Sequence, residues 1–150
     1  MFQRRKTFGI WGGFVEIEFP IEFLVHGTPA SAQAGTASRE DWKALVRAAS
    51  KFALSDFHVA SANPMSVTLF YWPEKPKRLD VDNMAKPILD ALNGHVYIDD
   101  RQVERLVAQR FEPGGDFIFA SPSDVLRGAL AAETPVLYVR VSDNPFEDLK

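Results

Sequence analysis

The sequence contains no cysteine, no long run of apolar residues and no internal repeat. Without cysteine the chain has neither disulfides nor thiolate metal ligands, which is compatible with a reducing compartment. No apolar stretch approaches the roughly 18 residues of a membrane-spanning helix, and the basic N-terminal stretch lacks the apolar region of a secretion signal. We therefore expect a soluble, cytoplasmic protein without a membrane partner.

A large excess of either charge is also missing. The chain has 17 basic and 20 acidic residues, a net charge of −3, which argues mildly against a nucleic-acid partner. Five of the acidic residues fall within residues 80–100, and without them 17 basic residues stand against 15 acidic ones, a balance of +2. A divalent cation bound by those five would remove the objection. Net charge therefore decides nothing about the partner.

Alternation of apolar and polar residues indicates four strands. The pattern between Phe14 and Val25 predicts one strand with a buried face, in which Pro20 marks an edge position or a bulge. Residues 65–72, 103–111 and 136–141 are rich in β-branched and aromatic residues and predict three more strands.

Helical spacing of apolar residues indicates two helices and a short third one. The first has Ser38 as its expected N-cap and includes Trp42 and Val46. The second is expected to begin near Lys86, because a proline at position 87 belongs in a first turn, and to end at Gly94. The third lies within residues 123–131.

These elements predict an α+β (mixed α/β) fold, in which one small sheet of about four strands packs with two to three helices. At 150 residues, 46% of them hydrophobic, we expect a single domain spanning 1–150. Segment 113–135 is a candidate accessory insertion, and 142–150 a candidate frayed tail.

The densest chemical signal is a group of carboxylates: Asp80, Asp82, Asp90, Asp99 and Asp100. If the chain leaving the second helix returns beside the segment that enters it, these groups come within several ångströms of one another. Two carboxylates about 4 Å apart repel by roughly 4 kcal/mol at an effective dielectric near 20, so such a cluster needs protons or a cation. Oxygen ligands without thiolate favour Mg²⁺ or Mn²⁺ over zinc.

Ordinary structural roles compete with this interpretation. Asp82 or Asn83 is a possible helix cap, and residues 99–101 are a possible solvated turn. A calcium-binding EF-hand loop is excluded, because Ala85 stands where that loop needs glycine and Ala91 where it needs glutamate. Capping and turn roles explain single aspartates but not the whole set, so we favour a metal site.

The run RLDVDNMAKPILDALNGHVYIDDRQV, residues 78–103, closely resembles the signature of the RusA-like Holliday-junction resolvases. In that family an Asp-x-Asp-Asn segment is followed by a lysine, an Asp-Ala-Leu, a short turn, and an aromatic-x-Asp-Asp before Gln-Val. The counterparts in this chain are Asp80, Asp82, Asn83, Lys86, Asp90, Tyr97, Asp99, Asp100, Gln102 and Val103.

The resemblance implies a homodimeric, Mg²⁺-dependent endonuclease (with Mn²⁺ as a possible substitute) that binds four-way junction DNA. Such an enzyme nicks two strands symmetrically in DNA recombination and repair. By this resemblance the catalytic metal ligands are Asp80, Asp82 and Asp100, and Lys86 is a catalytic base or a phosphate-contacting lysine. The supporting residues are Asn83, Asp90 and Asp99.

Basic residues flank the acidic run on both sides and form a candidate DNA-binding frame: Lys75, Lys77, Arg78, Arg101 and Arg105. Scattered, solvated surface charges are the plainer explanation. Two other functions remain open, a protein that binds branched DNA without cutting it and a metal-dependent phosphohydrolase of small molecules. The chain lacks a glycine-rich phosphate cradle, which weighs against the second.

Overall fold

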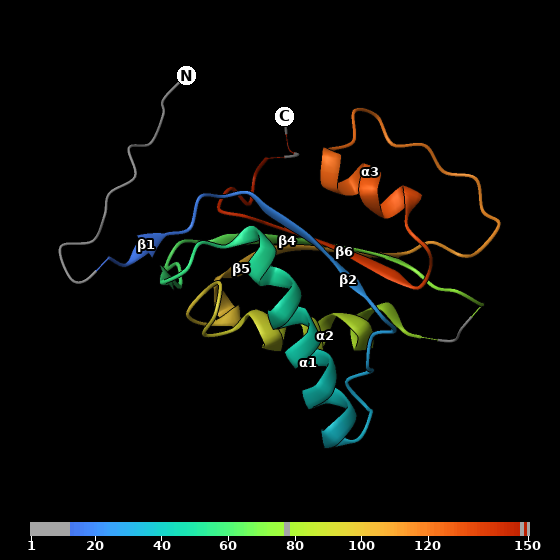
Figure 1. Ribbon diagram of the computed structural model, residues 1–150, viewed down its shortest axis with the longest axis horizontal. Helices are drawn as coiled ribbons and strands as arrows, with labels where there is room; N and C mark the ends of the chain where they lie inside the picture. Colours follow the sequence, from blue (N-terminus) through green and yellow to red (C-terminus); the bar gives the residue numbers. More distant parts are fainter. Residues whose placement is uncertain (1–12, 77–78, 148, 150) are drawn as a thin grey trace.

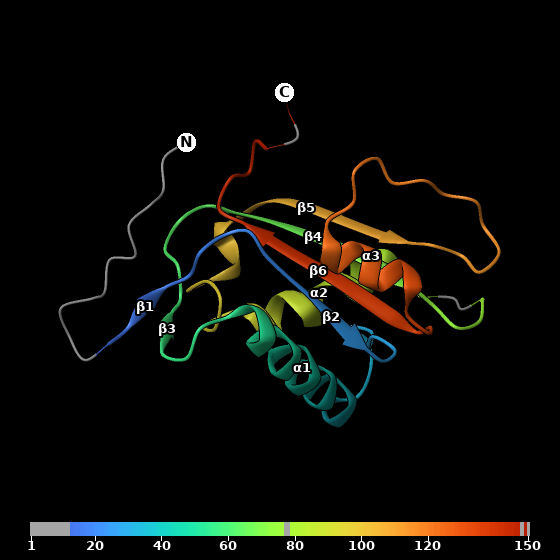
Figure 2. The ribbon, with the colours of Figure 1, turned by 45° about the horizontal axis from the view of Figure 1, so that its top comes forward.

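A computed structural model describes residues 13–76, 79–147 and 149. Its centre is a four-stranded sheet with the order β2-β6-β4-β5, in which β6 is antiparallel to both neighbours and β4 and β5 are parallel (Figure 2). The strands are β2 (Ile21–His26), β4 (Met65–Trp72), β5 (Val103–Arg110) and β6 (Val136–Ser142). A separate two-stranded parallel sheet pairs β1 (Val15–Glu16) with β3 (His58–Val59). The predicted α+β class and the four main strands are confirmed.

Helices α1 (Thr36–Ser50) and α2 (Val81–Leu92) cover one face of the main sheet (Figure 1). Side chains alternate between the two faces of a strand, so every second residue of β4 points at these helices. Val67 and Leu69 are fully buried there together with Met84 and Ile88 of α2. This core holds α2, which carries most of the candidate site, firmly against the sheet.

The opposite face is covered by α3 (Asp124–Ala131) and the chain leading to it (Figure 1). Aromatic rings dominate this second core, and Trp72 stacks on Phe111 with ring centroids 4.9 Å apart. Glu22 of β2 accepts hydrogen bonds from Ser123 and Tyr138, which ties the start of α3 to the sheet. The candidate accessory segment 113–135 thus supplies much of a second packed layer.

Two predicted boundaries near the N-terminal end are wrong. The strand predicted from Phe14 to Val25 is divided, because Pro20 lacks an N–H and stands between β1, which pairs with β3, and β2 in the main sheet. Helix α1 begins at Thr36, and its N-cap is Gly35, three residues before the predicted cap Ser38.

The tail predicted to be frayed is held in place as far as residue 147. Ser142 belongs to β6 and donates a hydrogen bond to Glu147 (3.0 Å). Arg140 also donates to Glu147, with a distance of 2.8 Å between its Nη2 and the carboxylate Oε2. These contacts return the chain to the sheet after β6 ends.

Candidate active site

The candidate site lies on the crossover from β4 through α2 to β5. Helix α2 begins at Val81, five residues before the predicted start, and contains Pro87 in its interior. Proline has no N–H to donate to the carbonyl four residues back, which here belongs to Asn83. The backbone N–H of Ala32 donates to that carbonyl instead, over 2.9 Å. The segment before α1 therefore docks on α2 where Pro87 leaves an acceptor free.

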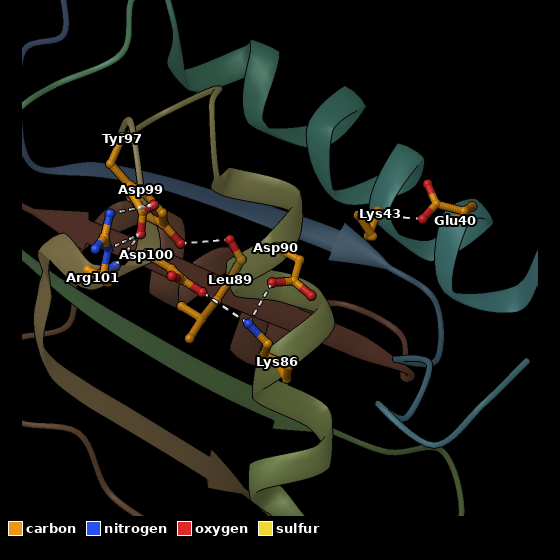
Figure 3. Close-up of polar contacts among 9 residues, drawn as sticks. All are labelled: Glu40, Lys43, Lys86, Leu89, Asp90, Tyr97, Asp99, Asp100 and Arg101. Carbon is orange, nitrogen blue, oxygen red and sulfur yellow. Dashed lines mark hydrogen bonds and ion pairs between the residues drawn. The ribbon is translucent and has the colours of Figure 1, made fainter. Parts of the chain in front are cut away.

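Lys86 is the centre of a charged triplet on the exposed side of α2 (Figure 3). Its Nζ lies 2.9 Å from Oδ1 of Asp90 and 3.0 Å from Oδ2 of Asp100. The hydrogen bond that Lys86 donates to Asp90, followed by the one that it donates to Asp100, raises the pKa of Lys86 above its ordinary value. In this arrangement the side chain is a cation at neutral pH, which suits electrostatic contact with phosphate better than proton abstraction.

Asp80 and Asp82 lie exposed at the start of the same helix. Asp80 occupies the N-cap position, yet its side chain makes no capping hydrogen bond. Its carboxylate accepts a long hydrogen bond of 3.4 Å from the side-chain amide of Asn83. Asp82 precedes Lys86 by four residues, so both lie on one face of α2. Asp82 and Asn83, the residues considered as possible caps, both lie inside the helix, and the carboxylate of Asp80 at the N-cap position is not engaged as a cap.

The structure does not bring Asp80, Asp82 and Asp100 together within a few ångströms. Asp80 follows Leu79, whose carbonyl accepts a hydrogen bond from Arg110 at the end of β5, whereas Asp100 stands just before β5 begins. In the part of the chain described, no group of three or more His, Asp or Glu side chains is arranged to hold a metal ion. The donors are all carboxylate oxygens, which suit Mg²⁺ or Mn²⁺, and their role as ligands stays a prediction.

Other residues of the acidic run form the support that presents Asp100. Asp99 caps the 3₁₀ turn Asp100–Gln102 by accepting from the backbone N–H of Arg101 over 2.9 Å. This bond is also the main reason why the pKa of Asp99 is lowered. Tyr97 is fully buried, and its hydroxyl donates to the Leu89 carbonyl over 2.7 Å. The spacing of Asp99 and Gln102 matches a capping box, the one sequence signal that foretells this role.

The candidate basic frame is divided by the fold. Lys75 is exposed between β4 and α2, and Arg101 is exposed beside Asp100, where it pairs with Asp99. Arg105 donates to Ser66 over 3.3 Å on the face of the sheet away from α2, so it does not lie beside the carboxylates. Lys77 and Arg78 lie outside the described residues. A DNA-binding role for these five side chains stays a prediction.

Fold and site together define a small α+β protein whose crossover helix exposes carboxylates around a lysine, a donor set suited to phosphodiester chemistry. The sequence model of endodeoxyribonuclease RusA matches residues 30–118, more than half of the chain. The chain belongs to the RusA family of endodeoxyribonucleases. It is thus a crossover-junction endodeoxyribonuclease, of a family that binds junction DNA and generally depends on a divalent metal.

No individual curated protein matches the chain. Across the described ranges, none of the helices has the length and apolar character needed to span a membrane.

Proposed function

We propose that this chain is a Mg²⁺-dependent Holliday-junction resolvase. It acts in the cytoplasm as a homodimer, in DNA recombination and repair, and resolves four-way junctions by paired, symmetric nicks. The observation that carries the proposal is the Lys86 triplet. In it, the positively charged Lys86 side chain lies between the carboxylates of Asp90 and Asp100, and its helix also exposes Asp80 and Asp82. A two-fold dimer suits the substrate, because a four-way junction presents two equivalent strands.

Asp80, Asp82 and Asp100 are the proposed ligands of Mg²⁺, with Mn²⁺ as a substitute. When bound, the metal supplies a more acidic water and stabilises negative charge on the reacting phosphate. Lys86 contributes a fixed positive charge that contacts a phosphate oxygen. This charge stabilises the transition state most if negative charge develops on that oxygen during the reaction. Asp90 orients that charge through its 2.9 Å ion pair. Asp99, by capping the turn, keeps Asp100 facing Lys86.

Among the described residues, no three or more His, Asp or Glu side chains are grouped to hold a metal ion, and this favours one alternative, a protein that binds branched DNA without cutting it. Cleavage of a labelled four-way junction beside linear duplex, with Mg²⁺, Mn²⁺ or EDTA, separates the two functions. We expect paired nicks near the branch point that depend on metal and leave the duplex intact. Tight junction binding with no nicks in either metal would support the alternative, and light scattering of the free protein tests the dimer.

Replacing Asp80 with asparagine tests the ligand assignment. Asparagine keeps the shape and N-cap propensity of the residue but removes its charge. We expect Asp80→Asn to slow junction cleavage by about 100-fold or more, comparable to the loss of one transition-state contact, while junction binding in EDTA is kept or tightened.

Asp124→Asn is the matched control, because Asp124 lies in the first turn of α3 on the opposite side of the sheet. Its cleavage rate should equal that of the unsubstituted protein. Normal cleavage by Asp80→Asn would remove Asp80 from the active site.

A further inference from the structure

Helix α1 carries a row of basic residues that the sequence patterns did not single out. Arg39, Lys43 and Arg47 follow one another at steps of four, so each lies about 6 Å further along the helix on one ridge. In Figure 3, Lys43 leaves α1 on the side of the view where α2 lies. We call these three residues the α1 basic row.

Hydrogen bonds connect both ends of the α1 basic row to α2, directly at Arg47 and through Ala32 at Arg39. Arg47 donates from Nε directly to the carbonyl of Ala91, over 2.8 Å. Arg39 donates from Nη1 to the Ala32 carbonyl over 3.0 Å, and the N–H of Ala32 in turn donates to Asn83. Arg39 is thus anchored beside the N-terminal half of α2 and Arg47 beside its C-terminal end. The row therefore runs alongside the helix that carries Asp82, Lys86 and Asp90.

The positive charge of the two arginines in the row is largely available, and that of Lys43 is available in part. None of the ion pairs within the described ranges involves Arg39 or Arg47. Of the five N–H donors of a guanidinium, Arg39 uses two and Arg47 one in the hydrogen bonds described. The Lys43 side chain is 20% exposed and pairs over 3.2 Å with Glu40, which is 61% exposed, so the ion pair has one well-solvated partner and is weak.

We propose that the α1 basic row binds the sugar-phosphate backbone of one DNA arm as that arm approaches the acidic face of α2. This inference rests on the proposed function and identifies the surface that holds its substrate. Phosphate contacts from Lys and Arg position DNA without reading its sequence. Placing these cations on the neighbouring helix lets a chain of net charge −3 bind an anion next to five carboxylates. It also leaves those carboxylates open to a metal.

The test measures how junction binding depends on salt, in EDTA so that no strand is cut. Each lost phosphate contact lowers the slope of log K against log salt by about 0.9 and weakens binding several-fold near 0.1 M salt. We expect Arg39→Gln and Lys43→Gln each to lower the slope by about one, and the double variant by about two. Arg47 is left in place, because its bond to Ala91 also satisfies a terminal carbonyl of α2.

Two controls separate charge from structure. Arg127→Gln removes an exposed cation from α3, beyond the opposite face of the sheet, and should leave the slope unchanged. The double variant Arg39→Lys with Lys43→Arg keeps both charges and should keep the slope. Lys43→Gln alone answers the question even if loss of Arg39 loosens the fold, because Lys43 pairs, within the part of the chain that the structure describes, with the exposed Glu40.

An unchanged slope in Lys43→Gln and in the double Gln variant would overturn the inference and leave the proposed function standing. Failure of the unsubstituted protein to bind the junction at all would overturn both.

Discussion

At the scale of single residues, the acidic run contains side chains with two different tasks. Lys86 and Asp100 meet on the solvent side of α2 and are available to a substrate. Gln102 faces inward: its side chain accepts from the N–H of Asp99 and donates to the carbonyls of Ser61 and Asn63. Residues close together in a motif are therefore not equally close to the chemistry.

Gln102→Ala removes all three of these hydrogen bonds and leaves the partly buried N–H of Asp99 without its acceptor, whereas the Ser61 carbonyl still accepts from the N–H of Ile98. We expect the free energy of unfolding, measured by urea titration, to fall by about 1–3 kcal/mol. Gln109→Ala, an exposed glutamine of β5, should change it by less than about 0.5 kcal/mol. Equal, small effects of both substitutions would show that Gln102 does not support the turn.

At the scale of elements, Pro87 joins α2 to the segment before α1. A proline in a helix interior normally costs stability, yet this one frees the carbonyl that receives Ala32. That single contact sets the segment beside the N-terminal half of α2, and through Arg39 it links the two helices.

Pro87→Ala gives the helix an N–H that competes for the Asn83 carbonyl. A hydrogen bond contributes about 0.5–1.5 kcal/mol net, so we expect the Ala32 amide to exchange with solvent about 2- to 10-fold faster. Hydrogen exchange followed by NMR measures this directly. Pro113→Ala, in an exposed turn, serves as the control and should leave Ala32 unchanged. Undiminished protection of Ala32 in Pro87→Ala would show that the contact does not depend on the missing N–H.

The same elements show which features follow from local sequence. The strand predicted over residues 65–72 is found unchanged, because enrichment in β-branched and aromatic residues is a local property of the sequence. The start of α2 was misplaced because the partner that makes Pro87 tolerable, Ala32, is 55 residues away. Arg105 was placed near the site by its distance along the chain, whereas the pleat of β5 directs it to the other face. Separation of Asp80 from Asp100 likewise depends on β5 pairing parallel to β4.

At the scale of the whole molecule, protonation of His95 makes the packing between segments that are distant in the sequence depend on pH. Its ring lies 2.8 Å from the Ser50 hydroxyl and edge-on to His58, with ring centroids 4.9 Å apart. Burial, together with the smaller effect of the nearby charges of His58, Arg47 and Lys51, lowers the pKa of His95 to about 4.

Between pH 6.5 and about 4 the unfolded chain therefore binds a proton at His95 that the folded chain does not. Stability contributed by neutral His95 is complete above pH 6.5 and is lost as the pH falls toward 4. Urea titrations at pH 7 and pH 4.5 should show a smaller loss of stability for His95→Gln than for the unsubstituted protein. Parallel profiles would contradict this role, since the carboxylates that titrate in the same range are common to both proteins.

The strand order has a consequence for synthesis of the chain. β6 lies between β2 and β4 and links them within the main sheet, although it follows β2, β4 and β5 along the described chain. A nascent chain that has already produced α2 and every residue of the acidic run still exposes two unjoined sheet edges until residues 136–142 leave the ribosome. The main sheet is therefore completed late, and the proposed catalytic residues are all synthesised before the strand that joins β2 to β4.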